Sequence, residues 1–113
     1  MLPETNRLKK EKDFEKLFKK GKAYKEDFLS LRVVKNNLKD SRFGFIVSNK
    51  FSKKAVVRNN IKRRLRSLIR AKMPDIKKGI DAAIIVIPGL EIDNFWELEE
   101  KINKLFEKAG ILK

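Results

Sequence analysis

The sequence contains no cysteine and no histidine among its 113 residues. The first absence excludes disulfide bonds and thiol nucleophiles, and the two together exclude the usual zinc sites. Histidine is also the side chain that most often acts as a general base near neutral pH. The chain therefore lacks the side chains on which many hydrolases and metalloenzymes depend.

Glycines and long apolar runs are also scarce. Only five glycines occur, at positions 21, 44, 79, 89 and 110, which is too sparse for a glycine-rich loop that holds the phosphates of a nucleotide. The longest apolar run, Ala82 to Pro88, falls far short of the roughly 20 residues that span a bilayer. The first residues do not have the pattern of a signal peptide. We therefore expect a soluble, cytoplasmic protein that is not a nucleotide-hydrolysing motor.

Acidic residues are missing from the middle of the chain. The net charge is +14, and residues 41–74 carry 11 basic side chains and no carboxylate. Such a segment repels itself in a folded protein unless an anion neutralises it, so we expect its charges to lack partners inside the molecule. We interpret residues 41–74 as the contact surface for a polyanion. In residues 1–40, where lysines and carboxylates mix, a merely solubilising role is equally compatible.

The spacing of apolar residues predicts one domain, residues 1–113, with three helices and three strands. Helices are expected at about 10–20, at 56–72 and from a cap at Asn94 to Gly110; strands are expected at 28–34, 42–48 and 80–87. The first two strands are predicted to form a hairpin. The third is apolar throughout, so it should lie centrally in the sheet and be covered on both faces. The predicted class is α+β, a sheet with helices packed on it.

The helix predicted at 56–72 has a basic side opposite an apolar side. The basic side repeats once per turn and comprises Arg58, Asn59, Lys62, Arg63, Arg66 and Arg70. Like charges four residues apart destabilise an isolated helix by about a few tenths of a kcal/mol per pair, which implies a compensating ligand such as phosphate. Lys50, Lys53 and Lys54 precede the helix, where unpaired backbone N–H groups also attract anions.

Phe14 and Phe18 are four residues apart and share one face of the helix predicted at 10–20. Such a pair is more often core than binding surface, but a partly exposed face beside Lys and Arg could stack unpaired bases. Carboxylates on this helix and on the last one are interpreted as solvated faces rather than a two-metal nuclease site. We predict no catalytic residue and no metal ligand in the chain.

The segment KAVVRNNIKR, Lys54 to Arg63, followed by Arg66, resembles the signature of the bacterial ribonuclease P protein subunit. The resemblance covers essentially the whole chain. Further matching features are Asn6-Arg7-Leu8, Asp13-Phe14 with Phe18, Phe43-Gly44-Phe45, Val47-Ser48 with Lys50, and the apolar strand before the last helix. The sequence departs from the family pattern at Asn49 and Asn60, where a basic residue is common.

The resemblance implies a two-layer α/β sandwich of a small mixed sheet and three helices, with a left-handed strand–helix–strand crossover that general topology rules do not predict. It also implies an accessory subunit of an endoribonuclease in which a catalytic RNA, with Mg²⁺ held mainly by RNA, removes the 5′ leader of precursor tRNA. The expected partners are the RNA subunit and the precursor tRNA, without membrane or DNA.

Two binding surfaces follow from the resemblance and the basic helix together. The RNA subunit is expected to contact Lys53, Lys54, Arg58, Asn59, Lys62, Arg63, Arg66 and Arg70. The single-stranded leader is expected to contact Phe14, Phe18, Leu31, Ser48 and Lys50. The alternative is a general RNA- or DNA-binding module, such as a ribosome-associated protein without a ribozyme partner. A stand-alone nuclease is disfavoured by the missing histidine and the ungrouped carboxylates.

Overall fold

The protein is described by a computed structural model covering residues 3–48, 54–86 and 95–113. The elements are a 3₁₀ turn (Glu4–Asn6), α1 (Glu11–Lys20), β1 (Lys22–Glu26), β2 (Leu29–Lys35), β3 (Arg42–Val47), α2 (Ala55–Lys72), a second 3₁₀ turn (Met73–Asp75), β4 (Ile80–Val86) and α3 (Phe95–Ala109). The three predicted helices are confirmed. The predicted cap Asn94 and the strand residue Ile87 lie outside the described residues.

The four strands form one mixed sheet in the order β1-β2-β4-β3. β2 pairs antiparallel with β1 and β4, whereas β3 pairs parallel with β4. The predicted hairpin between the strands at 28–34 and 42–48 is therefore wrong, because β4 lies between β2 and β3. The hairpin is instead β1–β2. The sequence pattern did not indicate β1 because this edge strand, KAYKE, offers Tyr24 as its single large apolar residue.

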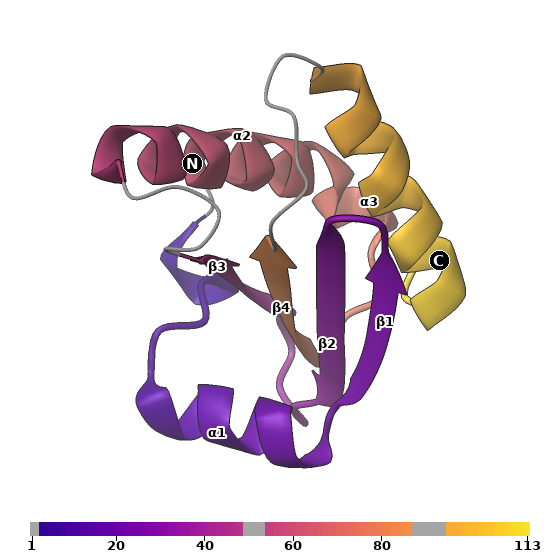
Figure 1. Ribbon diagram of the computed structural model, residues 1–113. Helices are drawn as coiled ribbons and strands as arrows, with labels where there is room; N and C mark the ends of the chain where they lie inside the picture. The colour runs from indigo at the N-terminus through magenta and orange to yellow at the C-terminus, as the bar shows by residue number, and fades with distance from the viewer. Residues whose placement is uncertain (1–2, 49–53, 87–94) are drawn as a thin grey trace.

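β4 lies between two other strands, as its apolar sequence predicted. Six of its seven residues are buried, because helices cover both faces of the sheet at this strand. Figure 1 shows α1 on one side of the sheet and α2 with α3 on the other. The expected two-layer sandwich thus gains a third, partial layer. β3, α2 and β4 form a parallel strand–helix–strand unit, and the left-handed crossover expected for it stays a prediction.

The larger core fills the space between the sheet and the pair α2 and α3. The apolar side predicted for α2 is buried there, through Ile61, Leu65, Leu68 and Ile69. Burying one such side chain contributes about 1.5–3 kcal/mol, so this face fixes which side of α2 points outward. None of the helices in the described ranges is long and apolar enough to cross a membrane.

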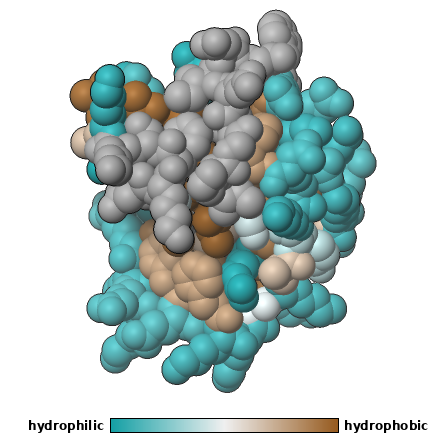
Figure 2. Space-filling model, viewed as in Figure 1, coloured by the Kyte–Doolittle hydropathy of each residue, from teal (hydrophilic) through white to brown (hydrophobic). Residues whose placement is uncertain are grey.

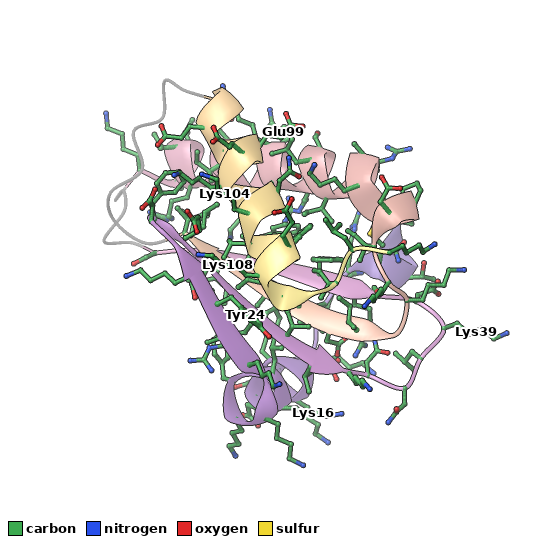
Figure 3. The ribbon with its side chains drawn as sticks, turned by 90° about the vertical axis from the view of Figure 1, so that its right-hand side faces the viewer. Lys16, Tyr24, Lys39, Glu99, Lys104 and Lys108 are labelled. Carbon is green, nitrogen blue, oxygen red and sulfur yellow. The ribbon has the colours of Figure 1, made fainter. Side chains whose placement is uncertain are left out.

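Ion pairs attach α3 to the β1–β2 hairpin. Lys101 Nζ lies 2.6 Å from Asp27 Oδ2 and 4.0 Å from Glu26 Oε1, and Lys108 pairs with Glu26. Figure 3 shows Lys104 and Lys108 along α3, with Tyr24 below them. The hydrogen bond from Lys101 is the main cause that lowers the pKa of Asp27. Carboxylates of the β1–β2 hairpin therefore neutralise lysines of α3.

Candidate nucleic-acid interface

α2 directs its basic residues away from the core. We call Arg58, Asn59, Lys62, Arg63, Arg66 and Arg70 the basic ridge. Asn59, Arg63 and Arg70 are exposed, and the other members are half-buried. Part of the ridge surrounds a surface pocket of about 470 Å³ lined by Asn59, Lys62, Arg63, Arg66 and Ser67. Amide, ammonium, guanidinium and hydroxyl donors converge on this pocket, which suits a phosphate group.

Most of the basic ridge has no acidic partner in the described part of the chain. Lys62, Arg63, Arg66 and Arg70 form no ion pair with any described residue. Arg66 instead lies over Phe45, with its guanidinium carbon 5.9 Å from the ring centroid. These cations are therefore available to an external anion.

Two other cations of residues 41–74 do have internal partners. Lys72 Nζ lies 3.9 Å from Glu99 Oε1, and Arg42 pairs with Asp81 and Asp13. The expectation that this segment lacks internal partners is therefore wrong for Lys72 and Arg42. Both pairs join segments far apart in the sequence, so a count of charges along the chain could not reveal them.

Lys54 directly precedes α2, is exposed and occupies the N-cap position without a side-chain capping hydrogen bond. The first turn carries no acidic residue. Arg58 follows one turn later and its backbone N–H donates to the carbonyl of Lys54 at 3.2 Å. The helix dipole and the basic side chains thus attract anions at the same end of α2. Lys50 and Lys53 lie outside the described residues.

The sheet face beneath α1 consists of rows of side chains that run across β2, β4 and β3. The registers give Val34-Asp81-Arg42, then Arg32-Ala83-Gly44, then Ser30-Ile85-Ile46. α1 covers the first two rows, where Leu17 packs with Ala83 and Val34. All three members of the last row are half-buried. We call Ser30, Ile85 and Ile46 the open row.

Phe14 and Phe18 differ in their surroundings. Phe14 is half-buried and its ring lies against Gly44, so it packs on the sheet. Phe18 is 40% exposed, and the guanidinium carbon of Arg32 lies 5.2 Å from its ring centroid. Figure 2 shows apolar surface where α1 meets the sheet, bordered by hydrophilic side chains. An exposed aromatic ring beside a guanidinium group can stack an unpaired base.

Leu31 does not line this surface. It is fully buried in the core on the opposite face of the sheet, under α2 and α3. Because side chains alternate along a strand, its neighbours Ser30 and Arg32 face α1 instead. Leu31 therefore cannot contact a ligand on the α1 side of the sheet, where Ser30 and Arg32 lie instead. Ser48 follows β3 directly and is half-buried.

A small pocket connects the basic ridge with α1. Its volume is about 230 Å³, and its lining comes from the N-terminal segment, α1, β3 and α2: Arg7, Leu8, Lys9, Phe14, Phe43, Gly44, Phe45 and Arg66. Arg66 and Phe14 therefore border the same cavity. A ligand on α2 could continue to the α1 face without leaving the protein surface.

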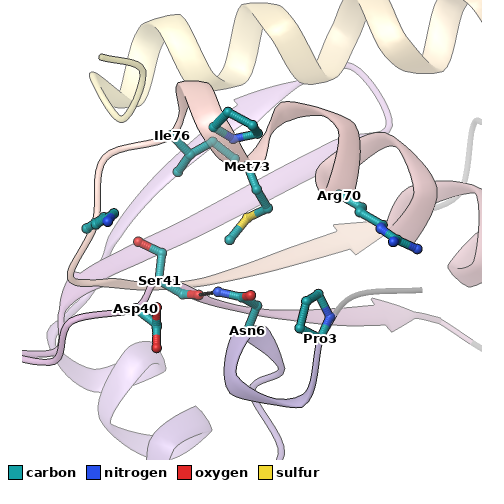
Figure 4. A pocket seen from close by; sticks show the side chains of 9 residues that line it. Pro3, Asn6, Asp40, Ser41, Arg70, Met73 and Ile76 are labelled. Carbon is teal, nitrogen blue, oxygen red and sulfur yellow. Dashed lines mark hydrogen bonds between the residues drawn. The ribbon is translucent and has the colours of Figure 1, made fainter.

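A third pocket, of about 350 Å³, lies between the N-terminal 3₁₀ turn and the end of α2 (Figure 4). Asn6 Nδ2 donates to the carbonyl of Ser41 at 2.8 Å across its floor. Of the predicted site residues in the described ranges, Arg70 alone lines this pocket. It therefore lies at the end of the basic ridge, apart from the α1 face.

Arg42 links α1 to the sheet through two carboxylates. Its Nε and Nη2 atoms donate to Asp81 at 2.8 and 2.6 Å, and its Nη1 atom donates to Asp13 on α1 at 3.2 Å. The hydrogen bonds to Asp81 are the main cause that raises the pKa of the Arg42 guanidinium. Asp13 was expected on a solvated face, and its role as a link was not predicted.

The carboxylates of the described residues do not form a metal site. No cluster of three or more Asp, Glu, Cys or His side chains able to hold a metal ion occurs among them. Asp13 pairs with Arg42, and Glu100 of α3 lies 3.4 Å from Lys104. These residues do not fit the Mg²⁺ that the family resemblance assigns to the holoenzyme. What the two surfaces offer is hydrogen-bond donors, positive charge and aromatic rings.

Comparisons with known proteins agree on one family. The sequence model described as Ribonuclease P matches residues 2–110. The chain is 42% identical to the ribonuclease P protein component of Synechocystis sp. (strain ATCC 27184 / PCC 6803 / Kazusa), over 98% of this chain and 90% of that protein. It is 39% identical to the ribonuclease P protein component of Dictyoglomus turgidum, over 98% of this chain and 94% of that protein.

Solved structures match as well. The RNase P protein from Thermotoga maritima superposes with a TM-score of 0.82 at 34% identity, over 90% of this chain and 96% of that one. The Staphylococcus aureus RNase P protein superposes with a TM-score of 0.87 at 24% identity, over 96% of this chain and 98% of that one. At this level of identity the match supports the fold alone. This chain therefore belongs to the bacterial ribonuclease P protein family, whose members are RNA-binding components of an endoribonuclease that processes tRNA.

Proposed function

We propose that the protein binds the catalytic RNA of ribonuclease P through the basic ridge and the 5′ leader of precursor tRNA between α1 and the open row. It thereby promotes 5′ maturation of tRNA. The observation that carries this proposal is the outward-facing basic ridge, whose Lys62, Arg63, Arg66 and Arg70 have no ion pair with described residues. Family membership supplies the identity of the RNA partner.

The basic ridge suits a folded RNA better than a specific base sequence. An A-form helix hides its base edges in a deep groove, so side chains on a rigid helix contact phosphates and shape. Each contact releases counterions, which makes the affinity strong and salt-dependent. The pocket lined by Asn59, Lys62 and Arg63 offers several donors to one phosphate. Guanidinium groups can bind phosphate oxygens in pairs, which adds orientation to affinity.

The α1 face suits a single strand. Phe18 is exposed beside Arg32, so an unpaired base can stack on the ring while the cation meets a phosphate; each stacked base contributes about 1–3 kcal/mol. Ser30 of the open row adds a hydroxyl group at the sheet. Unpaired leader nucleotides can reach these groups, whereas mature tRNA has no such nucleotides at its 5′ end. This surface therefore favours the substrate over the product.

Cleavage in this proposal belongs to the RNA subunit, to which bound Mg²⁺ supplies an activated water and charge stabilisation. The residues of this chain position the two RNA molecules and reduce the repulsion between them. The pocket bordered by Arg66 and Phe14 supports this role, because it makes the two surfaces continuous. The 5′ end of the precursor can then lie near the RNA subunit.

Reconstitution tests the proposal directly. Precursor tRNA is incubated with the RNA subunit at moderate Mg²⁺, with and without the protein, and leader release is measured. Stimulation by the protein is expected. Indifference would contradict the proposal and favour a general RNA-binding module. Cleavage by the protein alone would show a nuclease instead.

A further inference from the structure

α1 is held on the sheet by little apolar contact. Leu17 is its one buried residue, and Phe14 adds a half-buried ring. Two apolar contacts constrain the rotation of a ten-residue helix about its axis only weakly. Polar links must therefore set the orientation of the face that carries Phe14 and Phe18.

The link near the N-terminus of α1 is a chain of three charged residues. Asp81 lies in β4 and its side chain is 3% exposed. It also accepts a hydrogen bond from Asn36 Nδ2 at 2.8 Å. Because two donors of Arg42 bind the two oxygens of Asp81, the plane of the guanidinium group is fixed. Its remaining Nη1 atom then points to Asp13 at 3.2 Å.

A second polar contact holds the C-terminal end of α1 and comes from Arg32, in the row of side chains next to that of Arg42. Arg32 Nη1 donates to the carbonyl oxygen of Phe18 at 3.1 Å. Gly44 lies two residues after Arg42 on β3, and its missing side chain leaves room for the Phe14 ring. Asp13 directly precedes Phe14, so anchoring Asp13 to the sheet helps to hold the backbone from which the Phe14 ring extends.

Asp13 carries a negative charge next to a surface that is proposed to bind a polyanion. A carboxylate beside a surface for a polyanion costs affinity by repulsion, so electrostatics alone would favour its removal. Asp13 is only 24% exposed and faces Arg42 rather than solvent. We propose that Asp13, held by Arg42 and Asp81, is a positioning residue that orients α1 for leader binding. This inference rests on the proposed function of the α1 face.

The experiment uses the full-length protein assembled with the RNA subunit, and measures dissociation constants for precursor and mature tRNA. The variant is Asp13→Ala, and its matched control is Glu15→Ala. Glu15 lies on the same helix, is exposed, and has no ion pair with described residues. Both variants remove one negative charge from α1 and so raise its net charge by one. Only the first releases the link to Arg42.

We expect Asp13→Ala to weaken precursor binding by about three- to fivefold, the range that one partly exposed ion pair can supply, and to leave mature tRNA unchanged. Glu15→Ala should leave both constants unchanged or slightly tighter. Asp13→Asn keeps an oxygen acceptor for Arg42 and should recover most of the loss. In a Phe14→Ala background the Asp13→Ala change should have little further effect, because the residue acts through that ring.

The outcomes separate this inference from the proposed function. If neither Phe14→Ala nor Phe18→Ala lowers precursor affinity selectively, the leader surface itself is wrong. If Phe14→Ala is selective but Asp13→Ala matches Glu15→Ala, the positioning role is overturned and the leader surface stands. Equal losses for precursor and mature tRNA, without rescue by Asp13→Asn, would show that Asp13 only maintains the fold.

Discussion

The ring of Phe14 occupies the space that a side chain at Gly44 would need. A Cβ atom at Gly44 would come within 2.5 Å of Phe14 Cζ and 2.7 Å of Cε1. Such separations are far below van der Waals contact, so helix or ring would have to move. The absence of one methyl group in β3 thus lets α1 lie close to the sheet.

Gly44→Ala should therefore displace Phe14 and lower both stability and precursor affinity. Inserting a methyl group into a packed contact costs about 1–3 kcal/mol. Denaturant unfolding measures the first effect and precursor binding the second. The double variant Gly44→Ala/Phe14→Leu lacks the colliding ring atoms and should therefore regain stability. Unchanged stability of the single variant would show that the helix adapts without cost.

Phe18→Ala should reduce precursor binding without reducing stability. The ring is 40% exposed, so its removal leaves no large cavity. Loss of one stacked base corresponds to about 1–3 kcal/mol, or about five- to 150-fold in the dissociation constant. The measurement compares precursor and mature tRNA for the assembled enzyme. A loss of the same size for mature tRNA would remove Phe18 from the leader surface.

Arg63→Ala and Arg66→Ala should each weaken binding to the RNA subunit and flatten its salt dependence. Removing one phosphate contact lowers the slope of log affinity against log salt by about 0.7–0.9. Lys39→Ala is a matched control, because this exposed loop lysine lies apart from both surfaces (Figure 3). Titrations at several salt concentrations give the slope. Unchanged slopes in both arginine variants would exclude the basic ridge from the interface.

The attachment of α3 should weaken in acid. The hydrogen bond from Lys101 lowers the pKa of Asp27, and that from Lys108 lowers the pKa of Glu26. A carboxyl group whose folded pKa lies below its unfolded value, about 4, contributes stability above that value and loses it as the pH falls through the folded pKa. Denaturant unfolding from pH 6 down to about pH 3 should therefore show a smaller decline in Lys101→Met. If the stabilities of the wild type and of Lys101→Met decline equally with falling pH, the ion pairs of Lys101 do not contribute to the acid sensitivity.

The parts of the fold that local sequence determines were predictable. α2 is long, and its apolar residues Ile61, Leu65 and Leu68 repeat with the helical period, so its buried side and its basic ridge followed from spacing. The apolar sequence of β4 predicted its central position. Both features depend on residues within one element.

Features that depend on distant residues were not predictable. Two neighbouring strands in sequence suggested a hairpin, but β4 separates β2 from β3. Leu31 is a different case: the family resemblance assigned it to the leader surface, whereas the local alternation of the strand already places it in the core and its neighbour Arg32 on the α1 side. The pairing of Asp13 with Arg42 joins residues 29 positions apart. Propensity and periodicity carry no information about such contacts.

The strand order also constrains how the chain matures during translation. β4 is the only described strand that joins β2 to β3, yet it is the last strand to leave the ribosome. A nascent chain that ends before Ile80 contains α1, the β1–β2 hairpin and α2, but no strand to close the sheet. The larger core also contains Leu98, Ile102 and Phe106 of α3, so the basic ridge and the α1 face can reach their folded arrangement only after both β4 and α3 have been synthesised.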